Sequence, residues 1–498
     1  MAQESKDERR CPGERAPISE AICAARQERR YAKCAECEYH DRRRAEQEGT
    51  WPPEAAHVFK AYDIRGIYPT ELNEKLALAI GASTARYLGA RTLAVGRDMR
   101  TSSVALSEAA MKGIMLTGCD VLDLGLCSTD ANYFATGYYG VDGGIQTTAS
   151  HNPPQYNGFK ISRKDAVPVG MGSGLESIRN LALGPPLRPA VRPGKLEKKD
   201  VVNDFAQHVL GFARNVPRLK VVIDAGNGMA GRMLPPILER LPIQAKALYF
   251  QLDGTFPNHE PNPLKPENLK DLQREVRTSG AALGAAFDGD GDRCVFVDEN
   301  GTIVPCDLIT AVIARWLLRE HGKATIVYDV RSSRVVAEEI RANGGIPCRE
   351  RVGHAFIKAT MRKRGALFGG ELSGHFYFRD NYYADSGVIA LVMVLNVLGT
   401  EKKKLSEIIK PLRRYVSTGE INYQVEDKEG RIKALAAAFK GGRIDYKDGI
   451  TVEFDDWWFN VRPSNTEPVL RLNLEAKNKR QMQLRRKEVE KVILGKAK

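Results

Sequence analysis

Hydrophobic and polar positions follow two alternating patterns along most of this chain. From about residue 56 to 410, short apolar runs alternate with longer segments in which apolar residues recur every three or four positions. The short runs predict strands, and the longer segments predict amphipathic helices. The apolar runs that predict strands are residues 91–96, 120–126, 144–148, 220–224, 283–287, 294–297 and 325–329. Such alternation indicates α/β domains with mixed or parallel sheets.

The last hundred residues carry a different pattern. Residues 423–426, 449–454 and 457–461 predict antiparallel strands, and helices are predicted at 428–439 and 477–494. Consecutive strands flanked by helices indicate an α+β module rather than another α/β unit.

Chain length agrees with several domains, because 498 residues correspond to three or four units of about 150 residues. The predicted fold class is therefore α/β, with three similar α/β domains of mixed sheets, a C-terminal α+β domain and a short cysteine-containing arm. The predicted segments are the arm (1–55), domain I (56–200), domain II (201–305), domain III (306–410) and domain IV (411–498).

Composition narrows the class of protein. Hydrophobic residues make up 43% of the chain and charged residues 28%, which is ordinary for a folded globular protein. The longest apolar run, residues 388–398, is too short to span a bilayer. The first ten residues lack the apolar core of a secretory signal. These features predict a cytoplasmic protein with no membrane partner.

The formal net charge of +13 is concentrated near the C-terminus, where residues 477–498 hold 9 Lys and Arg against 2 Glu. A solvated helix face explains this segment, since helices favour cations in their last turns. No aromatic residue interleaves these charges, so a nucleic-acid partner is disfavoured. The remaining surplus suits phosphorylated small molecules.

A polar loop at residues 147–160 follows a predicted strand, which is where α/β sheets place ligands. Ser150 lies beside His151, and Lys160 lies downstream. A serine hydroxyl becomes a covalent nucleophile when a base and cations surround it. A Ser-His pair alone also fits an ordinary loop.

Residues 287–293 carry three carboxylates alternating with glycines directly after an apolar run: Asp288, Asp290 and Asp292. Hard oxygen ligands at this spacing suit Mg²⁺ or Ca²⁺. An EF-hand is disfavoured, because the loop lacks a Glu at its twelfth position. A solvated acidic turn is the alternative.

Residues 369–375 place Glu371, Ser373 and His375 among small residues. Their paired donors and acceptors suit the hydroxyls of a polyol. Each of them, taken singly, is equally suited to a turn.

Residues 462–471 lie between predicted strands and hold Arg462, Ser464, Asn465 and Thr466. Several hydrogen-bond donors within five residues are typical of a phosphate-binding loop. A polar turn is the alternative here too.

These four loops, in this order, resemble those of the α-D-phosphohexomutase superfamily, and most closely its bacterial phosphomannomutase/phosphoglucomutase group. The resemblance covers about residues 57–475 and includes the opening motif Tyr62-Asp-Ile-Arg-Gly66. It implies four domains around a central cleft. It also implies one Mg²⁺ held by Asp288, Asp290, Asp292 and a phosphate oxygen on Ser150. The implied catalytic residues are Arg65, Ser150, His151, Lys160, Arg293 and His354, and the implied substrate-binding residues are Tyr62, Glu371, Ser373, His375, Arg462, Ser464, Asn465 and Thr466.

The implied activity is the interconversion of hexose 6-phosphate and hexose 1-phosphate, with mannose, glucose or both, through a phosphoserine and a hexose 1,6-bisphosphate. The bisphosphate is also expected as an activator, and the protein is expected to be a monomer or dimer. Leu372 and Arg331 stand where close relatives are expected to have Met and Lys, which leaves the hexose open. Phosphoglucosamine mutase is one alternative, and a non-catalytic binding or regulatory protein using the arm is another.

The arm lies outside this resemblance. It holds Cys11, Cys23, Cys34 and Cys37, and clustered cysteines in a cytoplasmic chain suggest metal before disulfides. A tetrahedral Zn²⁺ site, with His40 as a substitute ligand, is one interpretation. An iron–sulfur cluster and free thiols are the others. Dense charge and few large apolar residues predict that the arm is otherwise disordered.

Overall fold

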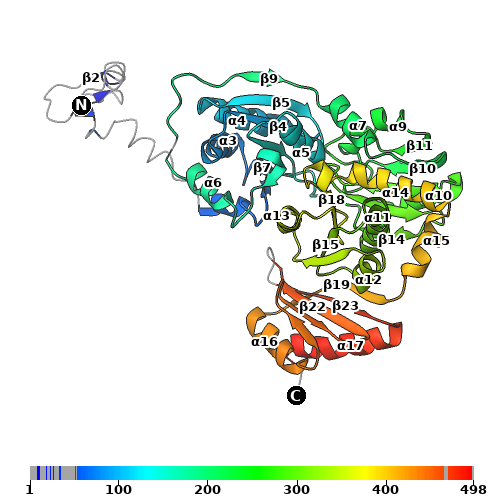
Figure 1. The fold of residues 1–498 in the computed structure, drawn as a ribbon. Coiled ribbons are helices and arrows are strands. Elements are labelled where there is room, and N and C mark those ends of the chain that lie inside the picture. The colour runs from blue at the N-terminus through cyan, green and yellow to red at the C-terminus, as the bar shows by residue number, and fades with distance from the viewer. Residues whose placement is uncertain are drawn as a thin grey trace.

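The computed structural model describes nearly all of the chain beyond the arm. Its described residues are 8–9, 11, 18–19, 23, 26, 33–34, 37, 51, 53–185, 187–464 and 469–495. Three mixed α/β units and a C-terminal antiparallel unit follow one another (Figure 1). This architecture confirms the fold class predicted from the sequence.

Domain I is built on a seven-stranded sheet in the order β3-β7-β6-β4-β5-β9, with β8 paired to β7. β4 pairs in parallel with β5 and β6, whereas β6 and β7 are antiparallel. Its strands are β3 (Ile64–Ile67), β4 (Thr92–Arg97), β5 (Asp120–Leu126), β6 (Gly143–Thr147), β7 (Tyr156–Arg163), β8 (Val167–Pro168) and β9 (Leu196–Lys198). Its α-helices are α3 (Glu74–Leu88), α4 (Ser103–Leu116), α5 (Thr129–Tyr138) and α6 (Leu175–Ala182).

Domain II has a five-stranded sheet in the order β11-β10-β12-β13-β14, in which β10 is parallel to both neighbours and β12 begins an antiparallel pairing. Its strands are β10 (Leu219–Asp224), β11 (Ile243–Leu248), β12 (Leu283–Phe287), β13 (Cys294–Asp298) and β14 (Ile303–Val304). Its α-helices are α7 (Val202–Leu210), α8 (Ala230–Met233), α9 (Pro235–Leu238) and α10 (Lys270–Ser279).

Domain III repeats the mixed pattern in four strands, ordered β16-β15-β17-β18. Its strands are β15 (Thr325–Asp329), β16 (Ile346–Glu350), β17 (Phe368–Gly370) and β18 (Phe376–Phe378). Its α-helices are α11 (Cys306–His321), α12 (Arg334–Ala342), α13 (His354–Arg364), α14 (Gly387–Glu401) and α15 (Leu405–Ile409).

Domain IV is a fully antiparallel sheet in the order β19-β23-β22-β21-β20. Its elements are β19 (Val416–Gln424), α16 (Lys428–Ala438), β20 (Arg443–Asp445), β21 (Ile450–Glu453), β22 (Trp457–Pro463), β23 (Val469–Ala476) and α17 (Lys479–Ile493). The strand predicted at 423–426 is wrong in position, because β19 alternates exposed and half-buried residues and has no apolar run of its own.

The hydrophobic cores show which domains form one body. Domain I has a core of its own. A single cluster of buried side chains also joins domains II and III and extends into domain I, and the apolar helix α14 belongs to it. Asn396 on α14 is satisfied there, since it accepts hydrogen bonds from the backbone amides of Arg214 and Asn215. Domain IV has a separate core. Among the described residues, no helix combines enough length with enough apolar character to cross a bilayer.

Candidate active site

Ser150 lies in the loop that joins β6 to β7, and its side chain is buried. Its hydroxyl donates to the Asp288 carboxylate at 2.9 Å and lies 3.2 Å from His151 Nδ1. Its φ of +50° places it in the left-handed region, which is costly for a residue other than glycine. The fold therefore brings the serine to the aspartates of domain II, 138 residues away in the sequence.

The strained backbone at Ser150 is held by a buried arginine that sequence analysis did not select. Arg100 donates to the carbonyl oxygens of Ser150 at 2.9 Å and Asn152 at 2.6 Å. Asp98 holds Arg100 at 3.2 Å and accepts from Thr148 at 2.7 Å. The available signal was a charged cluster, residues 97–100, directly after a strand.

The three aspartates follow β12, and all are buried. One carboxylate oxygen from each lies within 4.8 Å of the others. Burial raises the pKa of Asp288 well above its ordinary value, and the charges of Asp290 and Asp292 raise it further. A solvated acidic turn is thus excluded, and the site requires positive charge.

Lys160 supplies part of that charge from the neighbouring domain. It points from β7, and its Nζ contacts the carboxylates of Asp290, at 2.7 Å, and Asp292. Burial alone would lower the pKa of Lys160, but these carboxylates outweigh it and raise the pKa well above the ordinary value. Lys160 is therefore a fixed cation at the junction of domains I and II.

The aspartates retain capacity for a metal ion. Asp290 Oδ1 is buried and accepts no hydrogen bond from the described residues. Oxygen ligands are those that Mg²⁺ and Ca²⁺ prefer. The three residues therefore fit the Mg²⁺ expected from the sequence.

Arg293 and the 369–375 loop lie beside the aspartates. Arg293 Nε is 3.4 Å from Asp288 Oδ2 and 3.2 Å from His375 Nε2. Ser373 Oγ lies 3.0 Å from His375 Nδ1. Glu371 is buried, and it accepts from the Gly353 amide at 2.9 Å and from Tyr377. The structure thus connects the candidate sugar loop of domain III to the metal loop of domain II.

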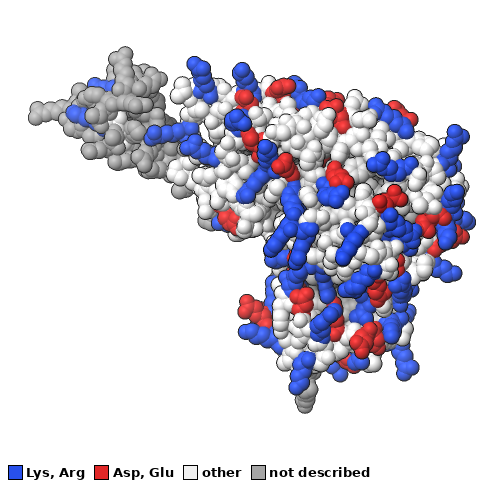
Figure 2. Space-filling view, viewed as in Figure 1, with Lys and Arg blue, Asp and Glu red and all other residues white. Residues whose placement is uncertain are grey.

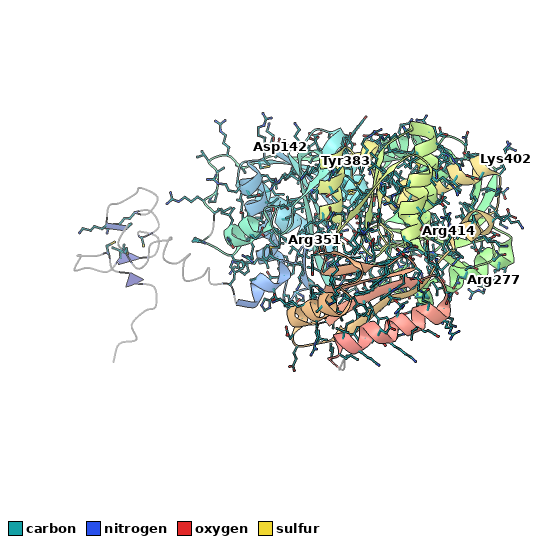
Figure 3. The ribbon with its side chains drawn as sticks, turned by 60° about the horizontal axis from the view of Figure 1, so that its bottom comes forward. Asp142, Arg277, Arg351, Tyr383, Lys402 and Arg414 are labelled. Atoms are coloured by element: carbon teal, nitrogen blue, oxygen red, sulfur yellow. The ribbon has the colours of Figure 1, made fainter. Side chains whose placement is uncertain are left out.

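His354 begins α13 and faces domain I. Its ring packs edge-on against Tyr62 at a centroid separation of 5.7 Å, and the Tyr62 hydroxyl donates to the Val352 carbonyl at 3.1 Å. Arg351, labelled in Figure 3, stacks on Phe356 at 4.0 Å, close to where domains I, III and IV approach one another. Tyr62 and His354, predicted separately, therefore form one contact.

Both site histidines outside the sugar loop are held neutral. Burial lowers the pKa of His151 well below its ordinary value, and Arg293 and Arg65 lower it further. Burial acts in the same way on the pKa of His354, followed by the charge of Lys358. Neutral imidazoles can accept a proton. Arg65 itself donates to the Asn152 side chain at 2.6 Å, beside the Ser150 loop.

The candidate phosphate loop, predicted at residues 462–471, lies in domain IV. Arg462 on β22 is buried and pairs with Glu420 at 2.9 Å. Arg331 of domain III lies 4.0 Å from the same carboxylate. Ser464 is described, whereas Asn465 and Thr466 lie outside the described residues. Figure 2 shows basic side chains gathered around the junction of domain IV with the rest of the molecule.

A second buried network was also missed by sequence analysis. Lys358 on α13 is fully buried, 2.7 Å from Asp385, and its ammonium lies 3.7 Å from the ring centroid of Tyr133 in domain I. Asp385 lies 3.8 Å from His375 Nε2. One lysine on an amphipathic helix gives no sequence signal of burial, so this network could be found only from the fold.

Comparison with known protein families gives matches along nearly all of the chain after the arm. The models of the phosphoglucomutase/phosphomannomutase family match in order: alpha/beta/alpha domain I at residues 56–180, domain II at 202–301, domain III at 305–415 and the C-terminal domain at 420–492.

Curated relatives agree. The chain is 40% identical over 432 residues to a phosphomannomutase of Salmonella typhimurium, covering 84% of this chain and 94% of that protein. It is 36% identical to a protein of Xanthomonas campestris named "Phosphohexose mutases", covering 88% and 99%. Among solved structures, a phosphoglucomutase/phosphomannomutase family protein from Burkholderia thailandensis aligns with a TM-score of 0.82 at 32% identity, covering 89% of this chain and 98% of that one.

The four loops and the four matching domains lead to one conclusion. A relative that is 40% identical and matched over most of both chains is sufficient to place the protein. This chain belongs to the phosphoglucomutase/phosphomannomutase family of the α-D-phosphohexomutase superfamily, and it is an enzyme, a phosphohexose mutase.

Proposed function

We propose that this enzyme interconverts hexose 6-phosphate and hexose 1-phosphate, with mannose, glucose or both as the sugar, through a phosphoserine at Ser150. The observation that carries the proposal is the Ser150 hydroxyl, 2.9 Å from Asp288 and beside a fixed set of cations. The names of the curated relatives support the substrate class.

The proposed reaction consists of two phosphoryl transfers, and the second restores the phosphoserine that the first consumes. A sugar hydroxyl oxygen bonds to phosphorus as the bond from phosphorus to Ser150 Oγ breaks, giving a hexose 1,6-bisphosphate and a free serine. The bisphosphate then turns over in the site and returns its other phosphoryl group to Ser150. Added hexose 1,6-bisphosphate acts as an activator, because it phosphorylates a serine that has lost its group.

Charge neutralisation is the main task in phosphoryl transfer. Lys160, Arg293 and Arg65 supply fixed positive charge around Ser150. A Mg²⁺ held by Asp288, Asp290, Asp292 and a phosphate oxygen on Ser150 would neutralise the transferring group further.

Histidines manage the proton of the attacking hydroxyl. Burial lowers the pKa of His354 and so keeps its ring unprotonated, and its buried Nδ1 has no hydrogen-bond partner among the described residues. It can therefore accept the proton as the sugar oxygen attacks. His151 is also neutral and lies 3.2 Å from Ser150 Oγ, so it can accept the hydroxyl proton when the free serine attacks the bisphosphate and return that same proton when the phosphoserine is next cleaved.

The two ends of the sugar phosphate need separate contacts for the turnover step. Glu371, Ser373 and His375 bind sugar hydroxyls, and Tyr62 lines the same region. Arg462, Ser464, Asn465 and Thr466 bind the phosphate that is not reacting. The separate core of domain IV supports a phosphate loop that can move to retain the intermediate.

Intact mass spectrometry tests the phosphoserine directly. After incubation with glucose 1,6-bisphosphate, the wild type is expected to carry one phosphoryl group and the Ser150→Ala variant none. Wild-type protein that never gains the group, and turns over no sugar phosphate, would favour a binding or regulatory protein instead.

Substrate preference is tested separately. Turnover of mannose 6-phosphate, glucose 6-phosphate and glucosamine 6-phosphate is measured with Mg²⁺ and with EDTA. We expect kcat/KM to be highest for mannose or glucose, and activity to be lost in EDTA. A higher value for glucosamine 6-phosphate would assign the enzyme as a phosphoglucosamine mutase.

A further inference from the structure

The four cysteines of the N-terminal arm are buried, although the arm has few large apolar residues. Among the described residues before Trp51, those classed as buried are Cys11, Cys23, Cys34 and Cys37, each 3–4% exposed. All four are free thiols rather than disulfides. The composition predicts disorder here, so the burial of these four side chains is a departure that needs a cause.

The local backbone turns two of the cysteines to the same side. Cys34 lies in a 3₁₀ segment, and the Cys37 amide donates to the Cys34 carbonyl at 3.2 Å. Side chains three residues apart in such a turn lie almost directly above one another. This is the arrangement that two-cysteine metal-binding turns require.

The other two cysteines are held by separate elements. Cys11 follows β1 (Glu8–Arg9), which pairs with β2 (Ile18–Ser19) in an antiparallel ladder. Cys23 is helical, as is Arg26 three residues later. The Arg26 guanidinium donates to Cys11 Sγ at 3.3 Å, so the segments that carry Cys11 and Cys23 are in contact.

Four buried thiols in so short a segment are crowded, and the Arg26 guanidinium already places a cation 3.3 Å from one of them, Cys11 Sγ. Crowded sulfur atoms need a cation to be stable as thiolates, and an N–H donor to sulfur is typical of the surroundings of a metal-bound thiolate.

The arm cannot fold on apolar burial alone. Its first 50 residues hold 11 Lys and Arg and 11 Asp and Glu, and chains of this size usually need a metal or disulfides to stay folded. We propose that Cys11, Cys23, Cys34 and Cys37 bind one Zn²⁺ tetrahedrally and that this ion forms the core of the arm. Zn–S bonds of about 2.3 Å would hold the sulfur atoms about 4 Å apart, so the ion would draw together thiols of which no three lie within 4.8 Å of one another in the described residues.

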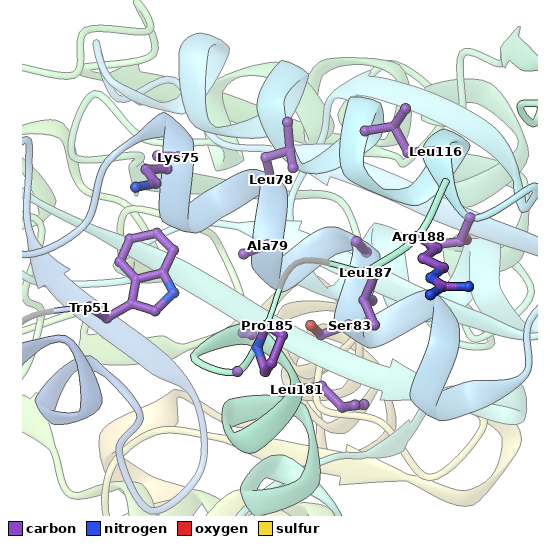
Figure 4. A pocket seen from close by; sticks show the side chains of 14 residues that line it. Trp51, Lys75, Leu78, Ala79, Ser83, Leu116, Leu181, Pro185, Leu187 and Arg188 are labelled. Atoms are coloured by element: carbon purple, nitrogen blue, oxygen red, sulfur yellow. The ribbon is translucent and has the colours of Figure 1, made fainter. Parts of the chain in front are cut away.

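The arm is joined to domain I through a packed residue. Trp51 lines a cavity of about 290 Å³ together with side chains of α3, α4 and α6 (Figure 4). Lys75 lies 5.0 Å from its ring centroid. Trp51 therefore packs the end of the arm against domain I.

Metal analysis of the full-length protein tests the proposal. After dialysis against EDTA, the protein is loaded with Zn²⁺, passed through a desalting column and measured for bound metal. We expect about one zinc per chain in the wild type, and its loss in the variants Cys34→Ser and Cys37→Ser. Cys348→Ser is the matched control, because Cys348 is a half-buried cysteine on β16, and it should keep the zinc.

A second variant separates this site from the aspartates. In Asp290→Asn the zinc of the arm should remain, and trypsin should cut the arm faster when the zinc is removed. Zinc lost in Asp290→Asn but kept in Cys34→Ser would overturn the proposal. So would iron with visible absorption, or zinc-loaded protein with four reactive arm thiols.

Discussion

The two ends of the active site hold their charges in different ways. At the Ser150 end, Lys160 contacts two aspartates across the junction of domains I and II, and all of these groups are buried. At the domain IV end, Arg462 and Arg331 share Glu420, whose side chain is 27% exposed.

The difference agrees with the role that we propose for each end. A transfer site gains most from charges that are already in place, because reorganisation would add to the barrier. A site that binds and releases a phosphate needs cations held by a carboxylate that the ligand can replace. Mutations at the first end should therefore lower kcat, and those at the second should mainly raise KM.

The largest effect is expected at Ser150. Ser150→Ala removes the hydroxyl that we propose carries the phosphoryl group, so turnover should fall by at least about 10⁴-fold. Steady-state kinetics and a melting curve measure this together. Ser162→Ala is the control, because Ser162 is a buried serine on β7 whose hydroxyl has no partner among the described residues. Substantial activity in Ser150→Ala would reject the covalent mechanism.

Lys160→Met should have the second largest effect on turnover. It removes a fixed cation from the transfer end, so kcat should fall about 10²–10³-fold. Because it leaves carboxylates unpaired, stability should also fall by about 3–5 kcal/mol, which thermal melting would detect. Lys199→Met, at an exposed pair with Asp204, should change neither value. A rise in KM with an unchanged kcat would contradict the distinction between the two ends.

At the domain IV end, Arg462→Ala should raise KM about 10–100-fold. This factor corresponds to the loss of one charge-assisted hydrogen bond to phosphate, which contributes about 1.5–3 kcal/mol. The value of kcat should change much less. Initial rates over a range of sugar phosphate concentrations separate the two constants. Arg443→Ala, at an exposed arginine of β20, serves as the control. Equal losses in kcat and kcat/KM would place Arg462 with the transfer groups.

The smallest expected effect is on the pH dependence of stability, and it comes from Asp130, a buried carboxyl of domain I. Burial raises the pKa of Asp130 from 3.8 to about 7, and Asp130 accepts from Ser386 of domain III at 2.6 Å. A raised carboxyl pKa stabilises the fold at low pH, and this contribution is lost as pH rises from about 4 to 7; it amounts to at most about 4 kcal/mol.

Asp130→Asn removes this titration. The fall in Tm between pH 5 and pH 8 should be smaller in the variant than in the wild type by a few degrees. Asp204→Asn is the control, since Asp204 has a lowered pKa through its bond from Tyr139. Identical pH profiles for Asp130→Asn and wild type would show that Asp130 does not titrate in this range.

Much of the fold could be predicted from the sequence. Residues 283–287 and 325–329 are strands β12 and β15 with the predicted bounds, because central strands are continuous apolar runs. The loops after them could be located for the same reason. Domain IV was harder, since half-exposed strands such as β19 lack such runs.

The contacts that the site residues make with one another could not be predicted from the sequence. Lys160 could be selected, but not its contact with Asp290, because the two are 130 residues apart. Burial or shared ion pairs define the roles of Arg100, Lys358 and Glu420. Neither property can be predicted from the residues next to them in the sequence. These contacts arise only when separate domains pack together.

Gly289, between the first two aspartates, has a consequence for motion. A Cβ at this position would lie 2.6 Å from the Ser150 carbonyl oxygen, so the two loops touch backbone to backbone. Domains I and II are therefore in direct backbone contact at this point, and a side chain at residue 289 would push the Ser150 loop away from the aspartates. An opening at this contact would separate Ser150 from the metal-binding carboxylates, so we expect a sugar phosphate to enter from the side of domain IV, whose core is separate from that of domains II and III.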